Sequence, residues 1–411
     1  MREGVWPSRL CPVSMPTNPL SSRQRALSLA AVVISTLGVG ISYGIGYPLT
    51  SLTFEKWGLD AWMSGLAGGA PALAIFLLLP LFPRLVGWLG PVQSMTLGCL
   101  VVASGFMLMA VLPIPEAWIA IRFLMGAGLA LPWLVGETWI NTVTTDAARA
   151  RMIALYSIAL FSGFAAGPFL LEIVGIDEIW PFLIGAVGII LAVVPILLAT
   201  RLAPVLPRHS ETGVAGALLL VPVAMTGAFL GGFLEMSHFS LLANYAVRNG
   251  MTGAEALRFL TVCMAGGVVL QFAIAWLADQ LPRALVLIAL AVCFVITSTV
   301  MAALIDTGWL AHVLIFIVGG QLVSFYTLAL AIIGETVPGR DLAVANAAFL
   351  IMYQAGAILG PTVSGLAMSA SPDFGFVGTM IVGTLVGILV LCFFVRRQPK
   401  HGPGLPRTSA P

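Results

Sequence analysis

The sequence predicts an all-α membrane protein with twelve transmembrane helices, arranged as two six-helix bundles related by a pseudo-two-fold axis. Its composition gives the first indication, because 59% of the residues are hydrophobic, only 9% are charged and the mean hydropathy is +1.04. A soluble domain carries about 25% charged residues, so most of this chain is expected to lie in a bilayer. A series of long apolar runs and an internal repeat give the other two indications.

Twelve apolar runs, separated by polar residues or by Pro and Gly, are each long enough to cross a membrane as a helix. A spanning helix needs about 20 apolar residues. The runs are expected at 26–49, 63–82, 92–112, 117–139, 151–173, 180–200, 214–242, 255–277, 284–304, 310–333, 343–368 and 375–395. An even number of spans places both termini on the same side.

The basic residues of the loops predict which side that is. Cytoplasmic segments of membrane proteins are enriched in Lys and Arg. With both termini inside, Lys56, Arg248 and Arg258 are the only basic residues of the outer segments, and Arg122 lies within a helix. We therefore expect a multi-pass protein of the cell (inner) membrane with both termini cytoplasmic.

The same runs define the expected domains. We expect a disordered cytoplasmic N-terminal tail at 1–25, an N-terminal six-helix bundle at 26–200, a Pro-rich cytoplasmic linker at 201–213, a C-terminal six-helix bundle at 214–395 and a cytoplasmic tail at 396–411. The first apolar run is too long for the core of a signal peptide, and no A-x-A cleavage site follows it. The sequence leaves open whether translation starts at Met1 or at Met15.

Three short motifs recur in the same order in the two halves. "GETW" (136–139) matches "GETV" (334–337), "GFAAGP" (163–168) matches "GAILGP" (356–361), and Pro-Arg at 83–84 matches Pro-Arg at 282–283. The offsets between the matches are nearly constant, at 198, 193 and 199 residues. Such ordered matches indicate a duplicated six-helix unit. Parallel repeats of this kind place a substrate site between the halves, near the middle of the membrane.

Longer stretches resemble the major facilitator superfamily. "RFLMGAG" (122–128) resembles the R-x3-G-x-G motif of its fourth helix, and "WLADQLPR" (276–283) resembles its loop motif between the eighth and ninth helices. Residues 136–168 and 231–283 resemble its YcaD-type group. The resemblance extends from about Ala26 to Arg397 and implies a transporter that works by alternating access. The G-x3-G-P motif of the fifth helix is similar to part of a motif associated with antiporters, which favours export over import.

Glu235 and His238 lie three residues apart in an otherwise apolar run, so on a helix they share a face. A charged Glu at the bilayer centre costs about 3 kcal/mol on insertion scales. Glu235 therefore either faces a water-filled cavity, where it binds protons or a cationic group, or is a neutral acid hydrogen-bonded to a neighbouring helix or reaching the outer interface. His238 is a second candidate, with packing as its alternative role. We expect Glu235 in the outer half of its helix, about 9 Å beyond the midpoint at 1.5 Å per residue.

Arg122 is the other charged residue expected at membrane depth. It lies about five residues inside the outer end of the fourth predicted helix. It either attracts an anionic group during the transport cycle or extends outward to the interface. The nearby glycines allow a second helix to approach closely, which favours an interior position.

Further polar and aromatic residues could line a central cavity, with packing as their alternative role. The candidates for proton or substrate binding are Gln271, Gln354, Tyr43 and Tyr326, and the additional lining candidates are Gln321, Asn346, Tyr47, Tyr353 and Trp133.

Charged residues near the cytoplasmic helix ends are candidates for an inner gate. This set comprises the repeat mates Glu137 and Glu335, together with Asp279, Arg283, Arg84 and Arg340. Ion pairs among such residues can form when the inner side closes and break when it opens. Ordinary interfacial charge is the alternative. The gate is expected to be asymmetric, because Pro80 stands where the repeat has Asp279.

The paired G-x3-G-P motifs place two small residues on one helix face, followed by a proline that lacks a backbone donor. We expect these residues to provide close packing and a hinge at the interface between the halves. They are Gly163, Gly167, Pro168, Gly356, Gly360 and Pro361.

Together these features predict a secondary active transporter, coupled to protons, that moves a small organic solute and needs no cofactor. We expect a monomer whose partners are the solute, protons and the lipid bilayer. The sequence has no CxxC, HExxH or P-loop motif, so a metal site, enzymatic activity and ATP-driven transport are not expected. Nucleic-acid binding is not expected either, because topology accounts for the basic residues. The alternative is a transporter-like membrane sensor or scaffold that moves nothing.

Overall fold

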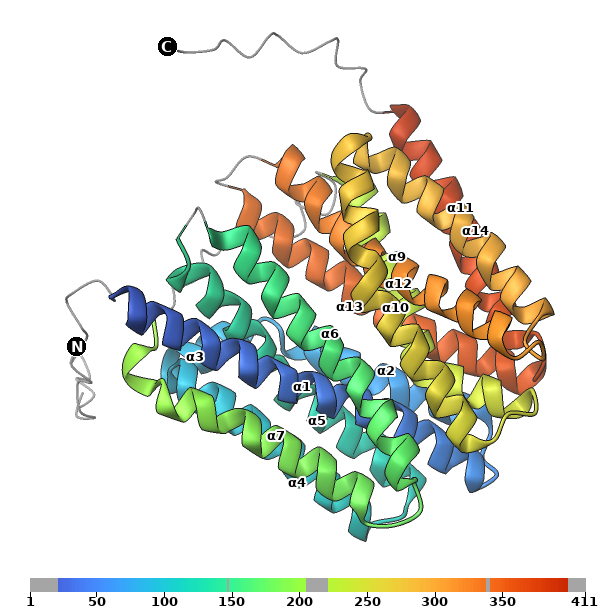
Figure 1. Cartoon of the computed structure of the whole chain (residues 1–411), viewed down its shortest axis with the longest axis horizontal. Coiled ribbons are helices and arrows are strands. Elements are labelled where there is room, and N and C mark those ends of the chain that lie inside the picture. The colour runs from blue at the N-terminus through green and yellow to red at the C-terminus, as the bar shows by residue number, and fades with distance from the viewer. Residues whose placement is uncertain (1–20, 146–147, 205–220, 338–340, 398–411) are drawn as a thin grey trace, which may run out of the picture.

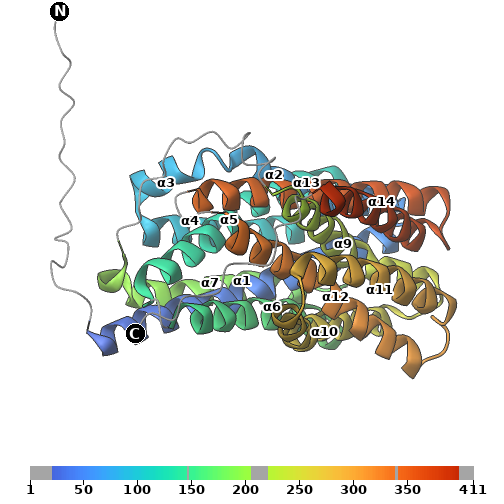
Figure 2. The same ribbon diagram turned by 90° about the horizontal axis from the view of Figure 1, so that it is seen from above.

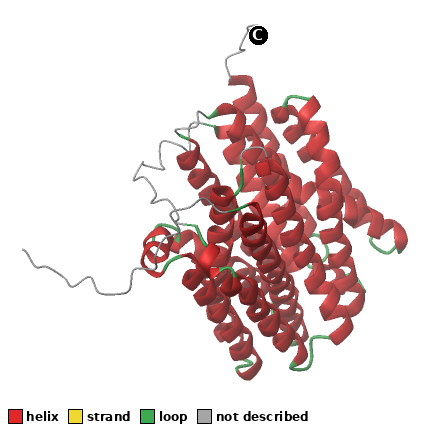
Figure 3. Cartoon of the chain, turned by 60° about the vertical axis from the view of Figure 1, so that its left-hand side comes forward, coloured by secondary structure: helices red, strands yellow, loops and turns green. Residues whose placement is uncertain are grey.

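The computed structural model describes residues 21–145, 148–204, 221–337 and 341–397. Within these ranges the chain is almost entirely helical and contains no strand (Figure 3). Twelve long helices and one short helix account for most of it. The predicted all-α fold is confirmed.

The first half contains seven helices and a final short turn. They are α1 (Ser22–Lys56), α2 (Ala61–Leu78), α3 (Phe82–Leu89), α4 (Pro91–Val111), α5 (Pro115–Val143), α6 (Arg149–Val174), α7 (Trp180–Leu198) and the 3-10 turn η2 (Thr200–Leu202). The second half contains α9 (Pro222–Arg248), α10 (Gly253–Gln280), α11 (Arg283–Ala303), α12 (Trp309–Thr336), α13 (Leu342–Ala370) and α14 (Gly375–Arg397).

Several helix starts follow from their first residues. The Ser21 hydroxyl accepts a hydrogen bond from the Gln24 backbone N–H at 3.3 Å, and the Gln24 side chain accepts one from the Ser21 N–H at 3.0 Å. Thr252 and Glu255 form the same reciprocal capping box at the start of α10. Proline occupies the first position of α4, α5 and α9, where its missing N–H costs nothing.

Several expected boundaries need correction. The capping box starts α1 at Ser22, so the last residues of the predicted tail are helical. The short helix α3 was not expected. Helix α9 ends at Arg248 rather than at 242, which places Glu235 at its midpoint rather than in its outer half. Helix α14 extends to Arg397. The expectations of disordered tails and a linker also concern residues 1–20, 205–213 and 398–411. These residues lie outside the described part of the chain.

Helix α9 differs from the other long helices. Among the described residues, eleven helices are long and apolar enough to cross a membrane, and the described part of α9 is not among them. Its sequence contains Glu235, His238, Asn244 and Arg248, and almost every residue from Val223 to Ala246 is buried. Helices α1, α2, α10, α12, α13 and α14 all contact it. Because protein rather than lipid surrounds α9, it can carry polar groups that a lipid-facing helix could not.

The two halves meet through equivalent helices. Helix α2 packs against α13, and α6 packs against α10 (Figures 1 and 2). The repeat relates α2 to α10 and α6 to α13, so each contact is the symmetry mate of the other. Helix α9 completes the interface by packing on α1 and α2. This exchange of repeat-related helices is the predicted pseudo-two-fold arrangement.

Helix α1 begins and α14 ends on the same side of the molecule, which we call the terminus side (Figure 1). The connections α1–α2, α6–α7, α9–α10 and α13–α14 lie on the other side, which we call the opposite side.

Candidate functional site

The two halves are joined on the opposite side by a polar network. Arg248 at the end of α9 donates from Nε to Glu55 Oε1 and from Nη2 to Glu55 Oε2, both at 2.9 Å, and Glu55 lies at the end of α1. Asn244 donates to Glu55 Oε2 at 3.2 Å and to the Ser64 hydroxyl of α2 at 3.3 Å. We call these four residues the closing network.

Two more contacts support this closure. Arg258 of α10 pairs with Glu172 of α6 at 2.6 Å, and the Trp62 backbone N–H of α2 donates to the Ser369 hydroxyl of α13 at 2.9 Å. A Cβ on Gly65 of α2 would lie 2.3 Å from the Pro361 carbonyl oxygen of α13, so the backbones touch at this level. The opposite side is therefore closed.

Sequence reasoning missed this closing network. It used Arg248 and Arg258 only as topology signals and did not use Glu55 or Glu172. A usable signal was present in the sequence. The acids Glu55 and Glu172 lie near the ends of α1 and α6, and the arginines Arg248 and Arg258 lie near the end of α9 and the start of α10. The repeat places all four helices at the interface between the halves. Sequence spacing alone does not show that the side chains meet in pairs.

On the terminus side, the hydrogen bonds and ion pairs that the described residues other than Asp341 form with one another lie within one half. Arg283 bonds Asp279 at 3.1 Å and Glu335 at 3.2 Å, and all three lie in the second half. Arg84 is exposed on α3 and has no ion pair within the described chain, and Arg340 lies outside it. Three of the six expected gate residues thus form one cluster within the second half, and bridging between the halves stays a prediction.

Glu137 lies in a different environment from its repeat mate Glu335. Helix α5 continues to Val143, so Glu137 is not at the helix end as expected. Its carboxylate accepts a hydrogen bond from the Trp133 indole N–H at 2.9 Å, and no described residue forms an ion pair with it. It interacts electrostatically with Tyr326 of the other half, which like Glu137 is only partly buried.

Glu235 is buried at the middle of α9. The residue is only 2% exposed, and the Tyr353 hydroxyl of α13 donates a hydrogen bond to its Oε2 at 2.9 Å. No described residue forms an ion pair with this acid. Burial without a cation disfavours its charged form, so it is suited to carry a proton.

Arg122 of α5 is also buried, and only 1% of the residue is exposed. Its guanidinium carbon lies 4.3 Å from the centre of the Tyr47 ring of α1. The Tyr47 side chain is its polar neighbour, but within the described residues none of its three nitrogens forms a hydrogen bond of normal geometry. A Cβ at position 46 would lie 2.5 Å from Nη1, so Gly46 allows the guanidinium to reach α1.

Aromatic rings connect the two charged residues across the interface. Tyr47 stacks on Tyr43 of its own helix and on Phe239 of α9, each with ring centres 6.0 Å apart. Phe164 of α6 contacts Tyr43 and Phe239 edge-on. Phe239 follows Glu235 by one helical turn, and Tyr47 interacts electrostatically with both Arg122 and Glu235. A cation from the first half and an acid from the second therefore flank one aromatic cluster.

The remaining candidates take different positions. His238 is buried within the second half, where its Nδ1 lies 2.7 Å from the Leu234 carbonyl oxygen and its ring contacts Phe294 and Phe376. These contacts fit packing better than substrate binding. Gln271 donates to the Val268 carbonyl of its own helix at 3.2 Å. Gln354 is buried, and Tyr326 packs edge-on against Tyr353.

The paired glycine motifs pack helices of the same half, which corrects their expected place between the halves. A Cβ on Gly163 or Gly167 of α6 would collide with the backbone of α1. A Cβ on Gly356 or Gly360 of α13 would collide with the backbone of α9. Pro168 is buried within continuous α6, whereas Pro361 contacts α2 across the interface.

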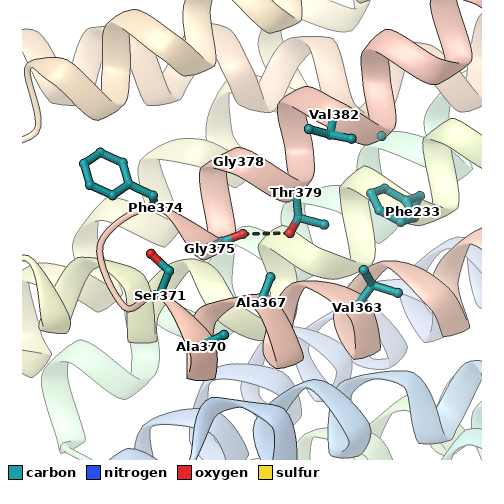
Figure 4. A pocket seen from close by; sticks show the side chains of 11 residues that line it. Phe233, Val363, Ala367, Ala370, Ser371, Phe374, Gly375, Gly378, Thr379 and Val382 are labelled. Atoms are coloured by element: carbon teal, nitrogen blue, oxygen red, sulfur yellow. Dashed lines mark hydrogen bonds between the residues drawn. The ribbon is translucent and has the colours of Figure 1, made fainter.

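An apolar hollow of about 520 Å³ lies away from the aromatic cluster described above, between α13 and α14 (Figure 4). Phe233 of α9 contributes to its lining, and Val363, Phe374 and Val382 leave it open toward the membrane-facing surface. Its lining contains no charged group, and the Thr379 hydroxyl is already donated to the Gly375 carbonyl. Ser371 supplies the other hydroxyl of the lining, so the hollow offers few polar contacts. Within the described residues, no group of three or more His, Cys, Asp or Glu could hold a metal ion.

The chain was compared with known families and sequences. The family model described as Major Facilitator Superfamily matches residues 28–330 and 225–411. An MFS-type transporter of Enterobacter sp. (strain 638) is 26% identical over 92% of this chain and 97% of its own length. The MFS-type transporter YcaD of Shigella flexneri is 29% identical over 62% of this chain and 67% of its own, and YfkF of Bacillus subtilis (strain 168) is 25% identical over 79% and 85%.

Solved structures share the fold. A bacterial homologue of the human lysosomal transporter Spinster, described as inward-facing and occupied, superposes with a TM-score of 0.74 at 16% identity, over 92% of this chain and 97% of that one. The nucleoside transporter NupG superposes with a TM-score of 0.69 at 15% identity, over 90% and 98%.

Proposed function

Since this chain belongs to the Major Facilitator Superfamily, we propose that its transport of a small organic solute is proton-coupled and that Glu235 carries the proton. The chain is a membrane transporter, and the fold and the relatives support no enzymatic role. The observation that carries the proposal is Glu235 itself. This acid lies at the midpoint of the most enclosed helix, bonded to Tyr353 and without a cation.

The structure suggests how the transporter alternates. The closing network joins the halves on the opposite side, and the ion pairs of Arg283 on the terminus side stay within the second half. The positive-inside pattern assigns the terminus side to the cytoplasm. The structure then corresponds to a state that is open to the cytoplasm. Breaking the closing network and joining the halves near Glu137 and Arg283 produces the other state.

Glu235 is positioned to couple solute transport to proton transfer. It can release or take up a proton when water reaches it, and its burial penalises the charged form when the site closes. A bound solute that changes the access of water to Glu235 therefore changes its protonation. We favour export, in exchange for protons, because of the G-x3-G-P motif in α6.

The experiment uses purified protein in lipid vesicles that contain a pH-sensitive dye. Gradients of metabolites and drugs are applied in turn to wild type, Glu235→Gln and Glu116→Gln, the last being a control acid that is exposed at the start of α5. We expect a solute-dependent pH change in wild type and in Glu116→Gln, and none in folded Glu235→Gln. Equal movement of labelled solute by all three proteins without a pH change would refute proton coupling.

A further inference from the structure

Arg122 is a buried cation without an anion. Among the described residues, the other basic side chains lie near helix ends or in ion pairs, such as Arg248 with Glu55 and Arg258 with Glu172. Arg122 alone in this set has all three nitrogens buried and unpartnered. Arg does not lose its proton in proteins, so a full positive charge stays at this depth.

The protein does not offset this charge. The cost of removing an ion from water is larger than the stabilisation that one cation–π contact returns. The Tyr47 ring is the partner that faces the guanidinium. Glu235 does not fill the role, because its Oε2 is bonded to Tyr353 and no ion pair joins it to Arg122 in this conformation.

The groups around Arg122 indicate which kind of anion would fit there. A planar carboxylate matches the guanidinium fork and can form two parallel hydrogen bonds. The rings of Tyr43, Tyr47, Phe164 and Phe239 form an apolar cluster from α1, α6 and α9 beside it. Each of these residues is at most 8% exposed, so a solute packs on the rings only when the helices move apart. Flat apolar groups pack well against such rings.

We infer that the solute is an organic monoanion whose carboxylate pairs with Arg122 and whose flat apolar body packs on Tyr47 and Phe239. This inference rests on the proposed transport function and names its substrate class. One buried cation matches one negative charge. A second carboxylate on the solute has no cation to meet among the described residues of the cluster, which selects against dianions.

The test compares three probes that share one ring system and differ in charge: 2-naphthoate, 2-naphthamide and naphthalene-2,6-dicarboxylate. Binding to purified full-length protein in lipid nanodiscs is measured by calorimetry for wild type, Arg122→Gln, Arg122→Lys and Arg201→Gln. Arg201 is an exposed arginine of η2, so it controls for the loss of one positive charge.

We expect wild type and Arg201→Gln to bind 2-naphthoate at least tenfold more tightly than the other two probes. Arg122→Gln should lose this preference, and Arg122→Lys should keep part of it because the charge remains. If Arg122→Gln does not fold, the order of the three probe affinities in wild type and in Arg122→Lys tests the inference instead.

Three results would overturn the inference: amide binding as tight as that of the acid, an unchanged preference in Arg122→Gln, or no binding of any probe. Proton flux driven by neutral or cationic solutes would then leave the proposed function intact. Absence of flux with every solute would instead remove the proposed function itself.

Discussion

The closing network predicts how the balance between the two conformations responds to mutation. Arg248 bonds both carboxylate oxygens of Glu55, and the two side chains are 17% and 22% exposed. A hydrogen bond to a charged group contributes about 1.5–3 kcal/mol, and partial exposure places this pair near the lower limit. Because 1.4 kcal/mol corresponds to a factor of ten, Glu55→Gln should raise the population that is open on the opposite side about tenfold.

Chemical labelling measures this population. Ser240 of α9 is 1% exposed and contacts Gly68 of α2, so a cysteine at 240 is accessible only when the halves separate there. In a background whose five native cysteines are replaced by alanine, the rate of Ser240→Cys labelling by a membrane-impermeant maleimide should rise about tenfold in Glu55→Gln and in Arg248→Gln.

The double variant tests the pairing itself. If the two residues act through one bridge, Glu55→Gln with Arg248→Gln should label no faster than either single variant. An unchanged rate in both single variants would refute the assigned role in closure. Multiplied rates in the double variant would show that the residues act independently.

Three further outcomes are expected. Gly356→Ala should unfold with about 1–3 kcal/mol less stability than wild type, because its Cβ would lie 2.0 Å from the Phe229 carbonyl oxygen; Gly378→Ala, with open space around it, is the matched control in thermal unfolding, and equal stability of the two variants would contradict the assigned packing. Glu335→Gln should lower stability by less than about 1 kcal/mol, because its side chain is 57% exposed in the pair with Arg283; a larger loss by denaturant titration would contradict a weak surface pair. Cysteines at the exposed positions 178 and 201 should react with impermeant reagents from outside and from inside the cell respectively, and the reverse pattern would invert the proposed orientation.

The length and spacing of the apolar runs predicted the twelve helices. Their boundaries were less predictable, because short-range capping decides them. The Ser21–Gln24 box extends α1 into the predicted tail, and α9 continues to Arg248 because protein surrounds its polar residues. A hydropathy pattern measures affinity for lipid, so it underestimates a helix that lipid does not surround.

Partner choice was the part of the site that spacing could not predict. Glu137 and Glu335 are equivalent in the repeat, but Glu335 meets Arg283 while Glu137 meets Trp133. His238 shares a helix with Glu235 but packs into the second half. These differences depend on which face of a helix meets which neighbour.

By itself, the sequence determined the membrane-spanning helical class, the duplicated halves and the presence of two charged residues at membrane depth, because composition and period are local properties of the chain. Only the tertiary structure decided that Arg122 meets no anion among the described residues, that Glu235 bonds Tyr353, and that Glu55 joins Arg248 across the halves. The physical reason is that these contacts join residues far apart in the chain, and the packing of whole helices brings them within hydrogen-bonding distance.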